Sequence, residues 1–290
     1  MESWDEIRTA YHVARLGTVS AAAGVLGVHH STVIRHVDAL EARLGIKLFQ
    51  RHQRGYTPTE AGSELLRIAA ATDDQFRQLS GRLMGRETAM EGELVVTALA
   101  EVAPLVDPVL VEFQRRHPQV TVVSITDERV LKLEYGEAHV AVRAGAQPQD
   151  PDNVVRHLAR MPVAGYAHAA YLASRDVPED NLAHHRFVGI SGPSRAPASV
   201  WMRSHLPEAA ISFRVSHQSG VLDAIHAGAG IGFLPVWCGR GEPGLVEVLA
   251  PRPEWSSDLW LVTHVDLHRS SKVQEFLHLV REAARTWPEG

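Results

Sequence analysis

Three histidines lie close together in the stretch AAAGVLGVHHSTVIRHVDALE, residues 21–41. Histidine is a common metal ligand and a frequent general acid or base near neutral pH, so the cluster suggests a metal site or a catalytic site. On a helix, His29 and His36 would be roughly 10 Å apart. Zinc ligands lie about 2 Å from the ion, so these two histidines cannot share one. His29 and His30 are neighbours that point apart, and no Cys, Asp or Glu completes a ligand set. The spacing therefore argues against a metal here.

Other residues that could ligate a metal or take part in catalysis give weaker evidence of a site. His264, Asp266 and His268 alternate, so on one extended strand they would share a face that can ligate a metal; a solvated strand end is the alternative. GAGIGF, residues 228–233, resembles part of a dinucleotide-binding loop, but a helix precedes it and a strand follows, so it reads as a helix stop. No G-x-S-x-G motif occurs. Cys238 is the single cysteine, either a redox thiol or a small buried apolar side chain. An enzyme is the weaker hypothesis.

Composition limits the remaining classes. The chain has 290 residues, 45% hydrophobic and 22% charged, which fits a globular protein of two or three domains. It has no run of about 18 apolar residues and no signal-like start, and its one cysteine fits a reducing compartment, so we expect a cytoplasmic protein. The net charge is −5, yet residues 35–54 hold five Arg or Lys and only two carboxylates. This basic stretch suits a confined phosphate-binding surface, or it is a solvated charged face.

The apolar pattern indicates how the histidine stretch is held. It predicts helices over residues 4–16, 18–26 and 31–44, with Gly17 and Gly27 ending the first two. A short helix, a glycine turn and a second helix with one apolar face form the helix-turn-helix pattern. IKLFQRHQRGY then reads as two short strands around a basic turn. The polar side chains off the apolar face suit base edges and phosphates.

A long helix and alternating strands follow. TPTE predicts a capping box, with Thr57 as cap, Pro58 in the first helical position and Glu60 closing the box. The helix it opens reaches about residue 84 and carries an apolar stripe that needs a partner, from within the chain or from a second copy; we favour a dimer seam. From residue 92 onward, strands alternate with helices, which predicts an α/β fold with a parallel sheet.

The same stretches resemble a known family. SAAAGVLGVHHSTVIRHVDALEARLGIKLFQR followed by YTPTEAG resembles the winged helix-turn-helix of the LysR-type transcriptional regulators. GELVVTAL, EFQRRHPQV, GEAHVAVR and AIHAGAGIGFLP resemble that family's effector-binding domain. The resemblance implies an α/β protein with an N-terminal all-α-type winged helix-turn-helix, a long linker helix and two α/β lobes similar to periplasmic binding proteins.

The implied domains are residues 1–58 for DNA binding, 59–91 for the linker and dimerisation helix, and 92–290 for effector binding. Within the last, lobe I is expected at about 92–162 and 266–290, and lobe II at about 163–265. We expect a transcriptional regulator rather than an enzyme, with no cofactor and no bound metal. The expected partners are double-stranded DNA with a partly palindromic operator, a small-molecule effector, and further copies of the chain. Those copies would form a homodimer through the linker helix and a homotetramer of such dimers.

Two sets of site residues are expected. The DNA-binding set comprises His29, His30, Ser31, Thr32, Ile34, Arg35 and His36 on the recognition helix, with Arg51 and Arg54 in the wing. The effector-binding set comprises Thr97, Leu99, Ala100, Glu101, Ser124, Thr126, Arg143, Ser199, Trp201, Gln218, Ser219 and Phe233.

The chain departs from the family pattern in three places. The recognition helix opens with His29, His30 and Ser31 where the family often has Ser-Gln-Pro or Ser-Gln-Ser, which suggests a weaker cap and an altered base preference. Ile34 stands where a serine often precedes the arginine; it would meet a thymine methyl or pack inside. Many relatives have hydroxyls at the first strand end, where this chain has Glu101. Our hypothesis is an effector that is neutral or carries an amine; the alternative is that Glu101 points to solvent.

Two alternatives come from other classes of protein. One is a solute-binding protein that does not bind DNA. The other is a metal-dependent enzyme that uses the strand at 264–268.

Overall fold

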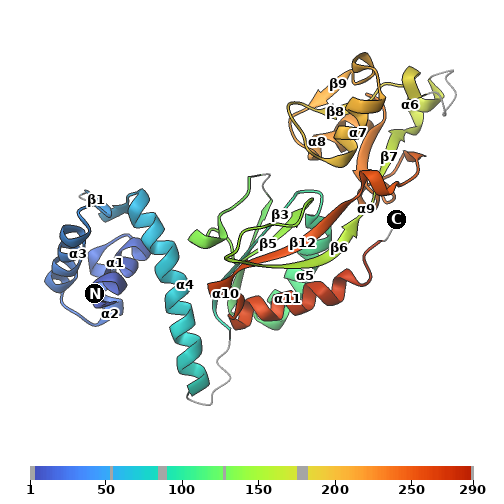
Figure 1. Ribbon diagram of the computed structural model, residues 1–290. Coiled ribbons are helices and arrows are strands. Elements are labelled where there is room, and N and C mark those ends of the chain that lie inside the picture. The colour runs from blue at the N-terminus through green and yellow to red at the C-terminus, as the bar shows by residue number, and fades with distance from the viewer. Residues whose placement is uncertain (1–3, 53–54, 84–89, 127–128, 175–181, 289–290) are drawn as a thin grey trace. The chain divides into compact units, whose positions relative to one another are not determined.

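The computed structural model describes residues 4–52, 55–83, 90–126, 129–174 and 182–288 (Figure 1). The chain divides into two compact units. The first comprises Met1–Gly92 with Lys132–Glu137, and the second comprises Glu93–Leu131 with Ala138–Gly290.

The first unit is a helical domain with a small hairpin. Its elements are α1 (Trp4–Leu16), α2 (Val19–Leu26), α3 (His30–Leu44), β1 (Phe49–His52), β2 (Gly55–Pro58) and α4 (Glu60–Leu83). The Thr18 hydroxyl caps α2 by accepting from the Ala21 amide, and Gly27 ends α2 with a φ of 66°. That left-handed backbone favours glycine and produces the tight turn to α3. The helix-turn-helix and the two strands of the wing are therefore as expected from the sequence.

The apolar faces of these helices meet in one core. Buried side chains from α1, α2 and α3 join Leu48 and Phe49 at the start of the hairpin. Ala22 and Val33 are fully buried there, and the small alanine side chains allow α2 to lie close to its neighbours. The Tyr56 amide donates to the Gly17 carbonyl at 2.8 Å, which fixes the hairpin against the turn between α1 and α2.

The expected capping box at Thr57 is wrong. Thr57 lies in β2, where it pairs with Gln50, and α4 begins only at Glu60. The cap is Thr59, whose hydroxyl accepts from the Gly62 amide at 3.2 Å and donates to the Lys47 carbonyl at 2.7 Å. This second bond joins the start of α4 to the segment before β1, a long-range contact that a local motif does not reveal.

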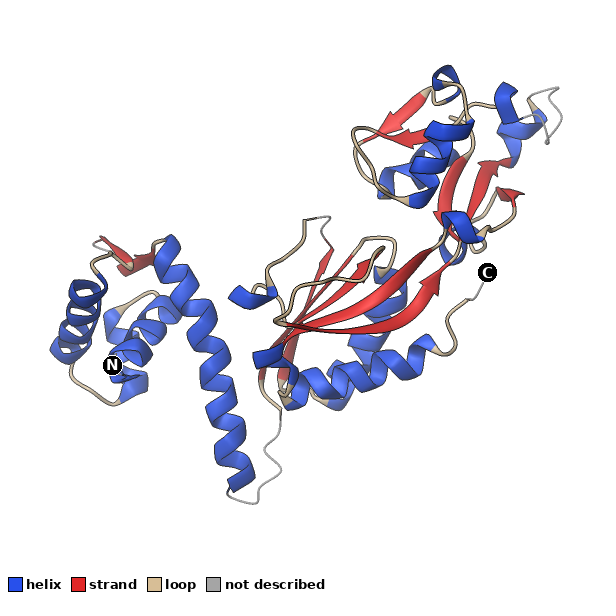
Figure 2. Cartoon of the chain, in the orientation of Figure 1, coloured by secondary structure: helices blue, strands red, loops and turns tan. Residues whose placement is uncertain are grey.

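The second unit holds two lobes, the first built on a five-stranded sheet of order β4-β3-β5-β12-β6. Its strands are β3 (Gly92–Ala98), β4 (Val120–Thr126), β5 (Val140–Ala144), β6 (Asn153–Met161) and β12 (Ser257–His264). The helices α5 (Ala103–Arg116) and α11 (Ser271–Ala284) lie side by side on one face (Figure 2), where Phe113 packs edge-on against Phe276. The short helical turn α10 (Val265–His268) follows β12, whereas the short turn η1 (Leu133–Tyr135) belongs to the first unit.

This sheet is mixed rather than purely parallel. β3 runs parallel to β5, but β12 runs antiparallel to both β5 and β6. Because β12 belongs to this sheet, the expected end of lobe II at residue 265 is wrong, and the chain returns to lobe I by Ser257. The two strands that pass between the lobes are paired there, Ser257 opposite Met161.

The second lobe is a smaller layered structure. Its strands are β7 (Val163–His168), β8 (Val188–Ile190), β9 (Phe213–Val215), β10 (Gly232–Pro235) and β11 (Leu245–Leu249). Its helical segments are α6 (Ala169–Ala173), η2 (Leu182–His184), α7 (Pro197–His205), η3 (Glu208–Ala210), α8 (Ser219–His226), α9 (Val236–Gly239) and η4 (Pro253–Trp255). β10, β7 and β11 form an antiparallel sheet. Val163 and Ala167 of β7 contact the α7 side while Ala164 and Tyr166 contact the α8 side, so both faces of this sheet are buried.

The metal alternative at residues 264–268 is not supported. β12 ends at His264, and Asp266 and His268 lie in α10, so the three side chains do not share a strand face. The His264 Nδ1 accepts from the Asp266 amide, and the His268 Nδ1 lies 2.8 Å from the Thr263 hydroxyl. Across the described ranges, no group of three or more His, Cys, Asp or Glu could hold a metal ion. No described helix is long and apolar enough to span a membrane.

Candidate nucleic-acid interface and ligand pocket

A histidine caps the recognition helix α3. The His29 Nδ1 accepts from the Ser31 amide at 3.3 Å and lies 2.8 Å from the Ser31 hydroxyl. An N-cap acceptor satisfies a helix amide that has no partner within the helix. His168 and His264 cap α6 and α10 in the same way. In this chain, imidazole thus takes the place that a hydroxyl or carboxamide usually fills, and the helix start is capped despite the departure from the family pattern.

The residues expected to read DNA divide into two groups. His30, Ser31 and Arg35 are exposed on α3, and Thr32 is half-buried. Ile34 is half-buried and packs against the domain core, which favours the packing alternative over a thymine contact. The exposed group occupies the first half of α3, the part of a recognition helix that reaches base edges.

His36 is turned toward α1. Its Nδ1 lies 3.0 Å from the hydroxyl of Thr9, a buried residue, and that hydroxyl donates to the Asp5 carbonyl at 2.6 Å. A carbonyl can only accept, so the single hydroxyl proton goes to Asp5 and the His36 Nδ1–H must donate to Thr9. His36 therefore links α3 to α1, and its Nδ1 is not available to a base.

Arg51 is occupied by carboxylates of the same domain. Its guanidinium pairs with Asp38 and, at 3.1 Å, with Glu41, and it lies over the Tyr56 ring. These contacts raise the pKa of Arg51, most of all the hydrogen bond to Asp38. Arg51 thus positions the wing against α3, whereas the sequence suggested a phosphate contact. Arg54 lies outside the described residues.

Glu41 is the residue that sequence reasoning missed. Its side chain is buried, and its Oε1 accepts from the Leu48 and Phe49 amides at 2.9 and 3.2 Å. Its Oε2 accepts from Lys47 at 2.7 Å and from Arg51. Burial acts to raise the pKa of Glu41, but the hydrogen bonds from Lys47, Leu48 and Phe49 outweigh it and hold the pKa below its ordinary value. A single carboxylate thereby joins α3 to the start of the wing.

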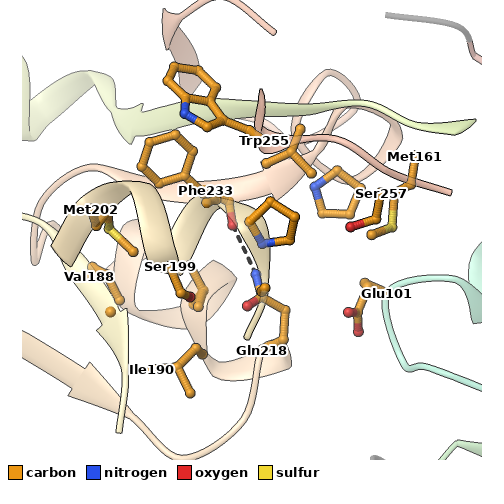
Figure 3. A pocket seen from close by; sticks show the side chains of 17 residues that line it. Glu101, Met161, Val188, Ile190, Ser199, Met202, Gln218, Phe233, Trp255 and Ser257 are labelled. Carbon is orange, nitrogen blue, oxygen red and sulfur yellow. Dashed lines mark hydrogen bonds between the residues drawn. The ribbon is translucent and has the colours of Figure 1, made fainter. Parts of the chain in front are cut away.

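A pocket lies between the lobes of the second unit (Figure 3). Its cavity volume is about 60 Å³. The wall is mostly apolar, from the second lobe and the two crossover strands. The lining residues are Glu101, Met161, Val163, Val188, Gly189, Ile190, Ala196, Pro197, Ala198, Ser199, Met202, Gln218, Val221, Phe233, Pro235, Trp255 and Ser257. Glu101 is the one charged residue among them.

Four residues of the expected effector set line this pocket, namely Glu101, Ser199, Gln218 and Phe233. The Gln218 amide donates to the Phe233 carbonyl at 2.9 Å and so fixes one wall. The remaining eight of that set lie outside the lining. Thr97 and Trp201 are buried elsewhere, and Leu99 is half-buried. Ser124 donates to Asp107, and Arg143 donates to the Leu131 carbonyl. The other three residues are exposed, namely Ala100, Thr126 and Ser219.

The lining also includes residues that sequence reasoning did not select. Met161 and Ser257 come from the paired crossover strands, and Trp255 packs edge-on against Phe233 behind them. No local motif marks these positions. The signal that could have found them is where the chain passes between the lobes, because a pocket between two lobes must border the crossover.

The lobes are also joined beside the pocket. The Glu101 carbonyl accepts from the Trp237 Nε1 at 2.8 Å and from the Cys238 sulfur at 3.6 Å. Burial raises the pKa of Cys238 to about 12, and the carboxylates of Glu101 and Glu242 act in the same direction. The thiol therefore stays protonated at neutral pH, which argues against the redox alternative.

Comparisons with known proteins agree with both parts of this arrangement. The family model described as "Bacterial regulatory helix-turn-helix protein, lysR family" matches residues 4–63, and that described as "LysR substrate binding domain" matches residues 88–285. A relative named "Probable HTH-type transcriptional regulator LtrA", from Klebsiella pneumoniae, is 26% identical over 284 residues, 92% of this chain and 90% of that protein.

Solved structures share the fold at low sequence identity. Full-length OxyR from Pseudomonas aeruginosa superposes with a TM-score of 0.67 at 17% identity, over 99% of this chain and 95% of that one. LysG from Corynebacterium glutamicum, solved with bound effector Arg, has a TM-score of 0.65 at 18% identity, over 97% of each chain. The family matches describe regulators and give no support to an enzyme or to a solute-binding protein that lacks DNA binding. The chain belongs to the LysR-type family of DNA-binding transcriptional regulators, with a helix-turn-helix at its N-terminus and an effector-binding domain after it.

Proposed function

We propose that this regulator reads a partly palindromic operator through the exposed first half of α3. The observation that carries the proposal is Arg35, which is exposed and, within the described part of the chain, has no ion pair or hydrogen bond. An arginine on a recognition helix can donate two hydrogen bonds to a guanine edge. His30 and Ser31 stand beside it on the first turn and would contact bases or the flanking phosphate.

A dimer would present two such helices to successive major grooves. An apolar groove of about 310 Å³ lies between α1, the end of α3 and α4. Its lining includes Trp4, Ile46 and Ile68, which are 40%, 48% and 49% exposed, and Phe76 beside it is 51% exposed and packs on Trp4. Exposed apolar area of this kind marks an interaction surface, so we propose that α4 pairs with a second copy here and that such dimers assemble into tetramers.

The effector would act by shifting a population of states rather than by chemistry. A small molecule that binds one arrangement of the two lobes more tightly favours that arrangement, and through it one arrangement of the DNA-binding domains. A DNA-binding regulator must be in the same compartment as the DNA that it binds, so we propose a cytoplasmic location.

Fluorescence anisotropy tests DNA binding directly. The full-length protein is titrated onto a duplex taken from just upstream of its own gene, at several salt concentrations, beside a scrambled duplex. We expect tight binding to the first duplex that weakens with salt, since phosphate contacts release counterions. Equal affinity for both duplexes, retained in Arg35→Ala, would show that α3 does not read this operator.

Sedimentation velocity tests the dimer. We expect Ile68→Glu to dissociate it, because a carboxylate would be buried in an apolar seam. Val111→Glu serves as control, since Val111 is an exposed apolar residue of the other unit. An unchanged sedimentation coefficient for folded Ile68→Glu contradicts the assignment of this face.

A further inference from the structure

The pocket between the lobes has a carboxylate at one place and the start of a helix at another. Together they indicate the chemical class of the effector. Of its seventeen lining residues, one is acidic, Glu101, and none is Lys, Arg or His. A half-buried carboxylate in a mostly apolar wall favours a cation over an anion beside it. Any ligand that reaches Glu101 should therefore place a positive group there.

The start of helix α7 forms another part of the same pocket, and it favours a negative group. Ala196, Pro197, Ala198 and Ser199, around the first turn of the nine-residue helix α7, line the pocket. No side chain caps α7, and the amides of Ala198 and Ser199 make no hydrogen bond within the described residues. Free amides at a helix start, together with the helix dipole, favour a carboxylate.

Two largely buried serines that line the pocket supply a second observation. Ser199 on α7 and Ser257 on β12 are 6% and 8% exposed, and both line the pocket. Across the described ranges, neither hydroxyl has a hydrogen-bond partner in the protein. Neither serine oxygen is among the fully buried polar atoms without a partner, so both oxygens are accessible and a polar ligand in the pocket can bond to them.

The arrangement is visible in Figure 3. Ser199 and Gln218 stand on the second lobe, Ser257 on the crossover strand, and Glu101 apart from them, on the loop that precedes α5. Met161, Met202 and Phe233 add apolar surface to the wall of the pocket. The cavity of about 60 Å³ admits only a small molecule unless the lobes separate.

We propose that the effector is a small apolar α-amino acid in its zwitterionic form. Its ammonium group pairs with Glu101, its carboxylate accepts from Ser199 and the first amides of α7, and its short side chain lies against Met161 and Phe233. Such a ligand connects the first lobe to the second, so its binding favours the closed arrangement. This inference rests on the proposed effector-binding function, and it names the chemical class of the ligand.

Isothermal titration of the full-length protein tests the proposal with defined probes. L-Alanine, L-valine and L-leucine are compared with 3-methylbutanoate, which is valine without its amine, and isobutylamine, which is valine without its carboxylate. We expect at least one of the amino acids to bind, and each valine analogue to bind at least tenfold more weakly than valine. Either analogue binding as tightly as valine, or no heat with any of the three amino acids, overturns the proposal.

Substitutions assign the two ends of the ligand. Glu101→Gln should weaken binding of the amino acid about tenfold, and Ser199→Ala several-fold. The controls are Glu112→Gln on the exposed face of α5 and Ser204→Ala on the same helix as Ser199, where the Ser204 hydroxyl donates to the Val200 carbonyl; both should bind as the parent does. Unchanged affinity in Glu101→Gln overturns the assignment.

DNA binding is measured separately, by anisotropy without any amino acid. A protein that binds its operator but none of the three amino acids disproves the ligand class alone. A protein that binds the amino acid but no DNA disproves the proposed operator reading and leaves the ligand class standing.

Discussion

The Trp237 indole donates a 2.8 Å hydrogen bond to the main-chain carbonyl of Glu101, a residue 136 positions earlier in the chain. Trp237 belongs to the second lobe and Glu101 to the first, so this bond crosses between the lobes at the edge of the pocket. It holds the loop that carries the single charged residue of the pocket lining.

Trp237→Phe should therefore affect both stability and ligand binding. We expect a loss of about 1 kcal/mol in the free energy of unfolding, the usual net contribution of a hydrogen bond. We also expect weaker amino-acid binding. Trp260→Phe is the matched control, because the Trp260 Nε1 donates at 2.8 Å to the Gly145 carbonyl within the first lobe. Urea unfolding and calorimetry separate the two effects; equal ligand affinities in both variants would contradict the role of the interlobe bond.

Arg35 and Arg51 should differ in what they control. Arg35→Ala should cost about 1–3 kcal/mol of specific DNA-binding free energy with no change in melting temperature, since Arg35 has no partner in the described protein. Arg51→Ala should lower the melting temperature of the DNA-binding domain, because Asp38 and Glu41 lose their shared cation. Anisotropy and calorimetric melting distinguish them. A stable Arg51→Ala protein would mean that the wing does not depend on this ion pair.

Glu41 should make the DNA-binding domain sensitive to acid. Its pKa in the folded protein lies below the ordinary value of 4.5. The stabilisation is therefore complete above about pH 4.5, and it is lost as the pH falls through the lower, folded-state pKa. Urea unfolding at pH 7 and at pH 4 should show a smaller difference in Glu41→Gln than in the parent. The same difference in both proteins would assign the acid sensitivity to other carboxylates.

His29 should be replaceable by another capping residue but not by alanine. His29→Ala removes the acceptor for the Ser31 amide and should cost about 1 kcal/mol locally, whereas His29→Asn should retain most of the cap. Hydrogen exchange of the first turn of α3 measures this, with faster exchange expected only in the alanine variant. Equal protection in all three proteins would indicate that the cap contributes nothing.

Cys238 should react slowly with alkylating reagents. Burial first, then Glu101 and Glu242, raise its pKa from 9.0 to about 12. At pH 8 the thiolate fraction is therefore about a thousandfold lower than for an ordinary cysteine. Iodoacetamide labelling followed by mass spectrometry, with urea-unfolded protein as reference, tests this. Equal rates in the two states would contradict a buried, protonated thiol.

The helical first unit of the protein was largely predictable from the sequence. Apolar spacing and the glycines at 17, 27 and 45 place α1, α2 and α3 within one residue of their ends, because these signals act within a turn or two of helix. The cap of α4 was not predictable in the same way. Thr57 and Thr59 flank the same proline, but Thr57 pairs with Gln50 in β2 while the Thr59 hydroxyl bonds to the distant Lys47 carbonyl and caps the helix.

The sites were only partly predictable, for the same reason. The apolar face of α3 predicted which of its positions are exposed. It did not predict that His36 contacts Thr9 of α1 or that Arg51 of the wing pairs with Glu41 of α3, because these contacts join different elements. Strand-end reasoning placed Glu101 at the pocket. It missed Met161 and Ser257, because their position depends on how two distant segments cross between the lobes.

The buried carboxylate of Glu41 has a consequence for protein engineering. The Glu41 carboxylate bonds to the Leu48 and Phe49 amides, to Lys47 and to Arg51. The residues of α3 and those of the wing therefore depend on one another and should be kept together. A chimaera that takes only the recognition helix from a relative would place that relative's residue at position 41 against a wing that evolved with Glu41. Operator preference should therefore be transferred by exchanging residues 28–58 together, and the crossover points for such a graft are the turn at Gly27 and the helix start at Thr59.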